Sequence, residues 1–70
     1  MQGLTERERG ILELVAHGQT SKEIAHSLGI ATQTVKLHVV HAARKLGAKN
    51  RAEAVAIALA RHYIESLPEA

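Results

Sequence analysis

The chain lacks several of the residue types with which small domains stabilise themselves. It has no cysteine, only one proline and only one aromatic residue, Tyr63. Disulfides and thiolate metal sites are therefore excluded. Helix packing has to stabilise the 70 residues, because a chain of this size buries only about 60% of the surface that its unfolded form exposes.

The sequence also lacks a segment that would place it in a membrane. No apolar run approaches the roughly 20 residues that span a bilayer. Charged residues occupy positions 6–9, where the apolar stretch of a signal peptide would lie. We therefore expect a soluble, cytoplasmic protein.

Catalytic and cofactor-binding patterns are missing too. There is no cysteine nucleophile, no pair of carboxylates in an apolar setting and no glycine-rich phosphate loop, and the chain is too small for a typical active-site pocket. The five histidines lack the tight paired spacings of structural zinc ligands. His38 lies beside an apolar stripe, which favours a partly buried packing residue. We expect no enzyme activity, no metal and no cofactor.

Charge is distributed unevenly along the chain. The net charge is only +2, but residues 24–52 contain no acidic residue. The same window holds five lysines and arginines and three histidines. A positive surface of this kind is typical of a protein with a polyanionic partner. An uneven, solvated surface is the simpler alternative.

Composition and periodicity predict an all-α fold. Helix-forming residues are abundant, and no alternation of apolar and polar residues marks a strand. Capping residues begin four segments and glycines end the first three. The caps are Thr5, Ser21, Thr32 and Asn50, with Glu8 and Glu53 at capping-box positions, and the glycines are Gly18, Gly29 and Gly47. The predicted helices cover about residues 6–17, 22–28, 32–46 and 51–64.

Apolar residues at helical spacing identify the buried face of each predicted helix. In the third helix they form a stripe of Val35, Val39, Ala42 and Leu46. The joints are short, so neighbouring helices have to pack at sharp angles. We expect a single compact four-helix domain over residues 1–70, with a core over 4–64 and a frayed tail over 65–70. Its second and third helices form a helix-turn-helix.

Several short motifs add a more specific signal. They are Leu4-Thr5, Arg7-Glu8, Ala16, Gly18, Lys22-Glu23-Ile24-Ala25, Leu28, Ile30, Thr34-Val35-Lys36, His38, Lys45-Leu46-Gly47, Arg51 and Ala54-Val55. In this order and spacing, about residues 4–60 resemble the DNA-binding domain of the LuxR/GerE family of bacterial transcription regulators. The resemblance implies a four-helix domain whose third helix contacts DNA and whose fourth helix commonly forms a dimer contact.

The third predicted helix has an outer face that can contact DNA, because an α-helix fits the roughly 12 Å wide major groove. The candidates for base contact are Gln33, Lys36, Leu37, Val40 and His41. The resemblance implies polar or basic residues at positions 37 and 40, where this chain has aliphatic ones. These side chains are consistent with weak base discrimination, with contact to thymine methyl groups, or with binding to a protein.

Phosphate contacts are expected beside this face. Helix N-termini attract phosphate through their free amides and positive dipole end, and lysine and arginine neutralise its charge. The candidates are Thr20, Ser21, Lys22, Thr32, Thr34, Arg44, Lys45, Lys49 and Arg51.

The fourth predicted helix is apolar around most of its circumference. One face packs on the domain, and a symmetric dimer would cover the other and present two third helices to a palindromic site. A monomer is the alternative. The expected interface residues are Ala52, Val55, Ala56, Leu59 and Tyr63.

The family pattern also places a charge at each of two distant positions, Glu8 and Arg51. We expect an ion pair between them, and two solvated charges are the alternative.

These observations predict a sequence-specific double-stranded DNA-binding protein that regulates transcription as a homodimer at palindromic promoter sites. The alternative is a protein-interaction module that keeps the fold and regulates a partner transcription factor by heterodimerisation, or that binds RNA polymerase. The promoter-contacting region of a sigma factor is a further DNA-binding alternative.

Overall fold

A computed structural model describes residues 3–65 of the chain, and its helices are α1 (Glu6–Ala16), α2 (Ser21–Leu28), α3 (Thr32–Leu46) and α4 (Arg51–Ala60). Within these residues there is no strand, so the predicted all-α, four-helix fold is confirmed. None of the four helices has the length and apolarity that a membrane crossing requires. The tail that was expected to fray covers residues 65–70. Of these, residues 66–70 lie outside the described residues.

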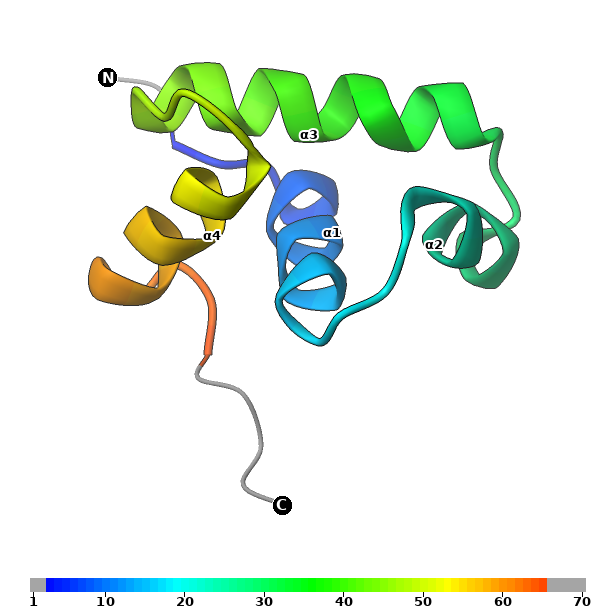
Figure 1. Ribbon diagram of the computed structural model, residues 1–70, viewed down its shortest axis with the longest axis horizontal. Helices are drawn as coiled ribbons and strands as arrows, with labels where there is room; N and C mark the ends of the chain where they lie inside the picture. The colour runs from blue at the N-terminus through cyan, green and yellow to red at the C-terminus, as the bar shows by residue number, and fades with distance from the viewer. Residues whose placement is uncertain (1–2, 66–70) are drawn as a thin grey trace.

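The longest helix, α3, runs along one side of the molecule. The other three helices lie together on one side of α3, as Figure 1 shows, and each of them contacts α3. This arrangement buries one face of α3 along its length and leaves its outer face without a covering element among residues 3–65.

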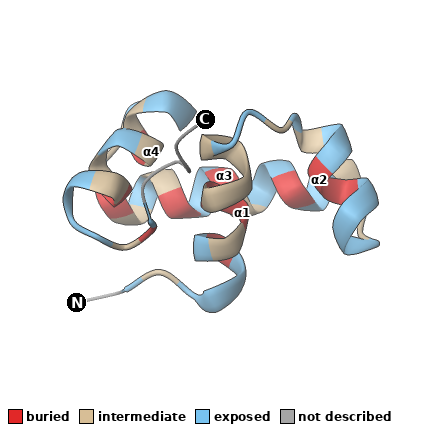
Figure 2. Cartoon of the chain, turned by 90° about the horizontal axis from the view of Figure 1, so that it is seen from below, coloured by how far each residue is buried: buried red, intermediate tan, exposed pale blue. Residues whose placement is uncertain are grey.

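The core consists of two apolar clusters that meet at α1 and α3. The first joins α1, α3 and α4 through Leu12, Ala42, Leu46, Ala54, Ala58 and Ile64. The second joins α1, α2 and α3 through Ile11, Ile24, Ala25, Val35 and Val39. Figure 2 shows buried residues recurring along α3 between exposed ones. The predicted stripe of α3 is thus confirmed as core.

Side chains cap three of the four helix N-termini. The capping box at Thr5 and Glu8 forms as predicted, with Thr5 Oγ1 accepting from the Glu8 N–H at 3.0 Å and Glu8 Oε1 accepting from the Thr5 N–H at 2.9 Å. Asn50 caps α4, but the Glu53 carboxylate accepts from the Lys49 N–H rather than from the Asn50 N–H, so the box there is incomplete.

Two of the predicted caps are displaced by one residue. Helix α2 is capped by Thr20, which forms a full capping box with Glu23, and not by Ser21, which is already helical. The N-cap of α3 is Ala31 rather than Thr32, and its methyl side chain makes no capping hydrogen bond. The last residue with extended backbone is Ala31, so the N-cap lies one residue earlier than the hydroxyl of Thr32 suggested.

All four helices end in the same hydrogen-bonding pattern, a Schellman motif. A residue with left-handed backbone follows the helix, and the next N–H returns to a carbonyl five residues back at 2.8–3.1 Å. The donor and acceptor pairs are Gln19 and Leu14, Ile30 and Ala25, Ala48 and Ala43, and Tyr63 and Ala58. The left-handed residues are Gly18, Gly29, Gly47 and His62.

The fourth motif corrects the predicted end of α4. The helix was expected to reach residue 64, but it stops at Ala60 because His62 takes a positive φ of 61°. The chain then turns back, and Ile64 becomes only 4% exposed in the core cluster with Leu12 and Ala58. The turn thus places the isoleucine side chain in the core, although the residues after Ala60 would by themselves permit the helix to continue.

Candidate nucleic-acid interface

The outer face of α3 gathers all five predicted base-contact residues. Their side chains are exposed on the face opposite the core stripe; they are Gln33, Lys36, Leu37, Val40 and His41. Leu37 and Val40 are 49% and 48% exposed, and they are the most exposed of the large apolar side chains among residues 3–65. His38 is half-buried beside the stripe, as the sequence indicated.

A hollow lies next to this face, where the C-terminal half of α3 meets the turn into α4. Its apolar part is formed by Val39, Val40, Ala43 and Ala48, and its polar part by Arg44, Lys49, Asn50 and Arg51. Three cationic side chains thus border an apolar depression at the edge of the outer face. The sequence indicated the cations but not the hollow, because the hollow depends on how the turn folds back against α3.

The N-terminus of α3 is open. Val35 is the first residue of the helix whose N–H bonds to a backbone carbonyl, that of Ala31 at 3.2 Å. Among residues 3–65, the amides of Thr32, Gln33 and Thr34 have no hydrogen-bond acceptor, because Ala31 supplies no side-chain cap. An uncapped helix N-terminus carries a partial positive charge. This end of the outer face is therefore electropositive without any charged side chain.

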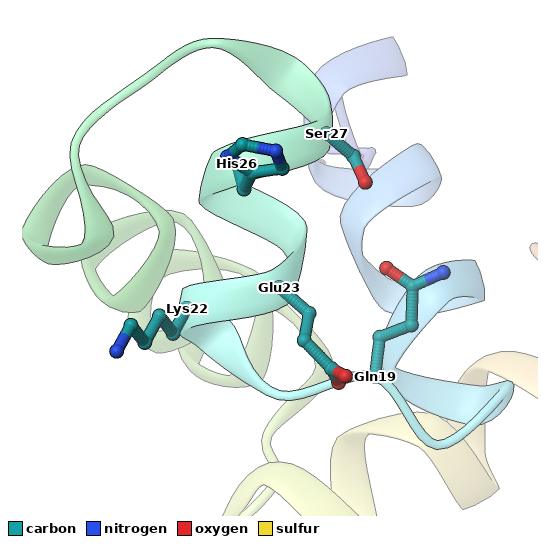
Figure 3. Close-up of a pocket in the computed structure, with 5 residues that line it drawn as sticks. All are labelled: Gln19, Lys22, Glu23, His26 and Ser27. Atoms are coloured by element: carbon teal, nitrogen blue, oxygen red, sulfur yellow. The ribbon is translucent and has the colours of Figure 1, made fainter.

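The N-terminus of α2 differs, because its capping box brings a carboxylate to it. Glu23 Oε1 accepts from the Thr20 N–H at 2.8 Å, and in Figure 3 the side chains of Glu23 and Lys22 point to opposite sides of the helix. Beside it is a hollow lined by Gln19, Lys22, Glu23, His26 and Ser27. The local negative charge makes this end a weaker anion site than the start of α3.

Most of the predicted phosphate-contacting residues lie at the surface. Thr20, Lys22, Thr34, Arg44, Lys49 and Arg51 are exposed, and Ser21 and Thr32 are half-buried. Lys45 is different: its Nζ lies 2.8 Å from Glu8 Oε1, and its side chain is only 21% exposed. Its charge is already paired inside the domain.

The predicted ion pair between Glu8 and Arg51 does not form, so this prediction is wrong. Glu8 pairs with Lys45, and Arg51 is exposed at the start of α4. The reason is geometric: Lys45 lies in the last turn of α3, and α3 packs directly on α1, where Glu8 is located.

The electrostatics of Glu8 reflect this environment. Burial raises the pKa of its carboxyl, but the hydrogen bond from Lys45, that from the Thr5 backbone and the charge of Lys45 outweigh burial, so that the pKa lies below its ordinary value of 4.5. The carboxylate is thus held in its charged form.

The predicted dimer residues of α4 are divided between two environments. Ala52 and Ala56 are exposed, one turn apart. Val55, Leu59 and Tyr63 are half-buried and pack against the core cluster of α1, α3 and α4. The exposed part of this helix therefore presents alanine methyl groups flanked by larger side chains.

Comparison with known proteins identifies the family. The family model described as "Bacterial regulatory proteins, luxR family" matches residues 2–58. Spore germination protein GerE of Bacillus subtilis is 48% identical over 52 residues, which cover 74% of this chain and 70% of GerE. The nitrate/nitrite response regulator NarL of Escherichia coli is 51% identical over 51 residues, 73% of this chain but 24% of NarL. The chain thus spans about a quarter of the longer relatives.

Solved structures agree with this assignment. The transcription factor GerE superposes with a TM-score of 0.85 at 31% identity, covering 91% of this chain and 97% of that one. The response regulator ChrA of a heme-sensing two-component system gives a TM-score of 0.86 at 38% identity, covering 91% of this chain and 32% of that one. A DNA complex of VqmA from Vibrio cholera gives 0.83 at 29% identity, covering 97% and 30%.

These matches cover most of the chain in both sequence and fold. The family consists of transcription regulators rather than enzymes, and the predicted resemblance is confirmed. The chain belongs to the LuxR family of bacterial regulatory proteins, in which it is a GerE-type helix-turn-helix DNA-binding domain.

Proposed function

We propose that α3 enters the major groove of double-stranded DNA with its outer face toward the base edges. The observation that carries this proposal is the position of the other three helices, which all pack on one side of α3 and leave the other side open. A helix of this length fits the groove only if its outer face is free. Lys36 and His41 then offer hydrogen-bond donors to base acceptors.

Phosphates are held on both sides of this helix in the proposed complex. At one end, the open amides of Thr32, Gln33 and Thr34 donate hydrogen bonds to a phosphate, as those of a helix N-terminus do. At the other end, Arg44, Lys49 and Arg51 border the hollow beside α3. Thr20, Ser21 and Lys22 contribute at α2. Lys45 serves the fold rather than DNA, because its charge is paired with Glu8.

In this proposal the domain acts as a homodimer through the outer side of α4, on a palindromic promoter site. Symmetric pairing of Ala52 and Ala56 would bring two copies close together. A dimer of helix-turn-helix domains places its two recognition helices on half-sites about one helical turn apart. The VqmA structure contains DNA, which supports a DNA-bound role for a similar domain. The site of action is the cytoplasm, at the nucleoid.

A salt series on duplex DNA tests the proposal. Each phosphate neutralised by a lysine or arginine contributes about 0.9 to the slope of log affinity against log salt concentration, so the four such side chains of the proposed complex predict a slope of about −3.6. Lys36→Ala should lower affinity about tenfold or more, as expected for loss of a base contact. Arg61→Ala removes the same charge at an exposed position after α4 and is the matched control. Equal affinities for the two variants would argue against α3 as the recognition helix.

A second function is favoured by the exposure of Leu37 and Val40. An apolar pair on the recognition face suits a protein partner, such as another regulator that the chain would sequester in a heterodimer, or RNA polymerase. Chemical-shift mapping distinguishes the two functions. Addition of duplex DNA should perturb residues 20–22 and 32–45 in the first, whereas only addition of a protein partner should perturb Leu37 and Val40 in the second.

A further inference from the structure

Leu37 and Val40 form an apolar pair at the centre of the outer face of α3. They are three residues apart and therefore lie on the same side of the helix. Within residues 3–65, the one other large apolar side chain with comparable exposure is Leu28, on α2. No element of the described chain covers the pair, so an external partner accounts for it better than the fold does.

The surroundings of the pair indicate which partner. Lys36 and His41 flank it along the helix, and Val40 shares the basic hollow with Arg44, Lys49 and Arg51. No acidic residue occurs between positions 24 and 52. An apolar pair ringed by cations and uncapped amides is complementary to a surface that is itself apolar at its centre and anionic at its edges. The major groove at a thymine has this character, because its methyl group lies between two phosphate backbones.

We propose that Leu37 and Val40 are specificity-determining residues that contact pyrimidine C5-methyl groups in the major groove. The inference rests on the proposed function, in which α3 occupies that groove. Neither side chain can donate or accept a hydrogen bond, so neither distinguishes bases by their polar edges. Thymine is the base that presents an apolar group there. A leucine or valine therefore favours thymine over cytosine by packing alone.

The spacing of the pair fits two neighbouring bases. Residues three apart in an α-helix are separated by about 4.5 Å along its axis, and successive bases of one strand are about 3.4 Å apart. The pair therefore spans adjacent or nearly adjacent base pairs, and each half-site should contain two thymines at these positions. The chemistry extends to 5-methylcytosine, whose methyl group occupies the same place. Methylation of cytosine at these positions should strengthen binding.

Deoxyuridine substitution tests this inference, since it removes the methyl group and keeps base pairing. A binding site is first selected with the unaltered protein from random-sequence duplex DNA. Each thymine of the selected site is then replaced singly by deoxyuridine, and affinity is measured by fluorescence anisotropy. Two adjacent or nearly adjacent positions in each half-site should lose about fourfold in affinity per methyl group. At these positions, a duplex with 5-methylcytosine should bind more tightly than a duplex with cytosine, by a similar factor in affinity.

Side-chain truncation completes a double-mutant cycle. Leu37→Ala and Val40→Ala should weaken binding to the thymine site, and each should then be insensitive to deoxyuridine at its own position. Leu28→Ala, an apolar truncation on α2, is the matched control and should leave both affinities unchanged. Circular dichroism of each variant verifies the fold, and both positions are exposed enough for the fold to persist.

The outcomes separate the inference from the function on which it rests. Absence of salt-dependent DNA binding overturns the proposed function. Salt-dependent binding that is indifferent to deoxyuridine at every position overturns the methyl contact and leaves the proposed function standing. A deoxyuridine effect that persists unchanged in both alanine variants also overturns it, because another residue would then contact the methyl group.

Discussion

Lys45 Nζ lies 2.8 Å from Glu8 Oε1, and the same oxygen accepts the Thr5 N–H at 2.9 Å. One carboxylate, only 4% exposed as a residue, therefore closes the capping box of α1 and anchors the last turn of α3 to it. This one charged group therefore links the start of α1 to the last turn of α3.

Glu8→Gln should destabilise the domain. The amide keeps an acceptor for Thr5 but leaves the partly buried ammonium of Lys45 without its counter-charge. We expect a loss of about 1–3 kcal/mol in the free energy of unfolding, measured by urea denaturation. Glu6→Gln changes an exposed acid in the same turn and should cost far less. Equal losses for the two variants would mean that the Lys45 pair contributes nothing.

The same pair makes stability depend on acid pH. The pKa of Glu8 is lowered in the folded protein from an ordinary value of 4.5. The unfolded chain therefore binds this proton more readily, so the contribution of Glu8 is complete above the unfolded pKa and is lost as pH falls through the folded pKa. The stability difference between the unaltered protein and Glu8→Gln should be constant above about pH 5.5 and shrink below about pH 4.5. A constant difference down to pH 3 contradicts this.

The sequence predicts what local signals encode. The four helices follow from capping residues, helical periodicity and three glycines, and the core stripe of α3 follows from Val35 to Leu46. The choice of ion-pair partner for a charged side chain does not follow from such local signals. Glu8 has several basic residues within possible reach in an unfolded chain, and only the packing of α1 on α3 selects Lys45 over Arg51. Likewise, His62 carries no sequence signal for a left-handed turn, so the end of α4 was predicted four residues late.

His62 occupies a position where the three other helix ends have glycine. A side chain in the left-handed region costs roughly 1–2 kcal/mol, whereas glycine there costs about 0.5–1 kcal/mol of extra unfolded-state entropy. His62→Gly should therefore stabilise the domain by up to about 1.5 kcal/mol. Thermal unfolding followed by circular dichroism measures this.

Gly47→Ala is the converse control for His62→Gly. A Cβ at Gly47 would meet no described atom within 4 Å, so the cost of Gly47→Ala is the backbone conformation, roughly 1–2 kcal/mol, less the about 0.5–1 kcal/mol of unfolded-state entropy that replacing glycine saves. A lowered melting temperature for His62→Gly would show that the imidazole stabilises the turn by more than its strain.

The bare N-cap of α3 separates stability from DNA binding. Ala31 already has the extended backbone of an N-cap residue, with φ −71° and ψ 145°. Ala31→Asn and Ala31→Asp should each stabilise the domain by about 1 kcal/mol by capping an open amide. The neutral asparagine should reduce DNA affinity little, whereas the carboxylate of aspartate competes with phosphate and should reduce it about tenfold or more. Equal affinity of the two variants at low salt would place the phosphate elsewhere.

The proposed dimer surface predicts the effect of a charge at its centre. Ala56 is exposed on α4, and in a two-fold symmetric interface any substitution occurs twice. Ala56→Glu would bury two like charges against apolar surface, so it should weaken dimerisation at least tenfold, measured by sedimentation equilibrium. Ser27→Glu adds the same charge at an exposed position of α2 and should leave dimerisation unchanged.

DNA binding then distinguishes an interface defect from a folding defect. A variant that folds but does not dimerise loses the gain in affinity that comes from linking two sites. Ala56→Glu should therefore lose affinity for a palindromic duplex and retain affinity for a single half-site, because its α3 is unaltered. If both duplexes lose affinity equally, then the substitution affects the fold of the single domain rather than dimerisation, and the result contradicts a dimer interface at α4.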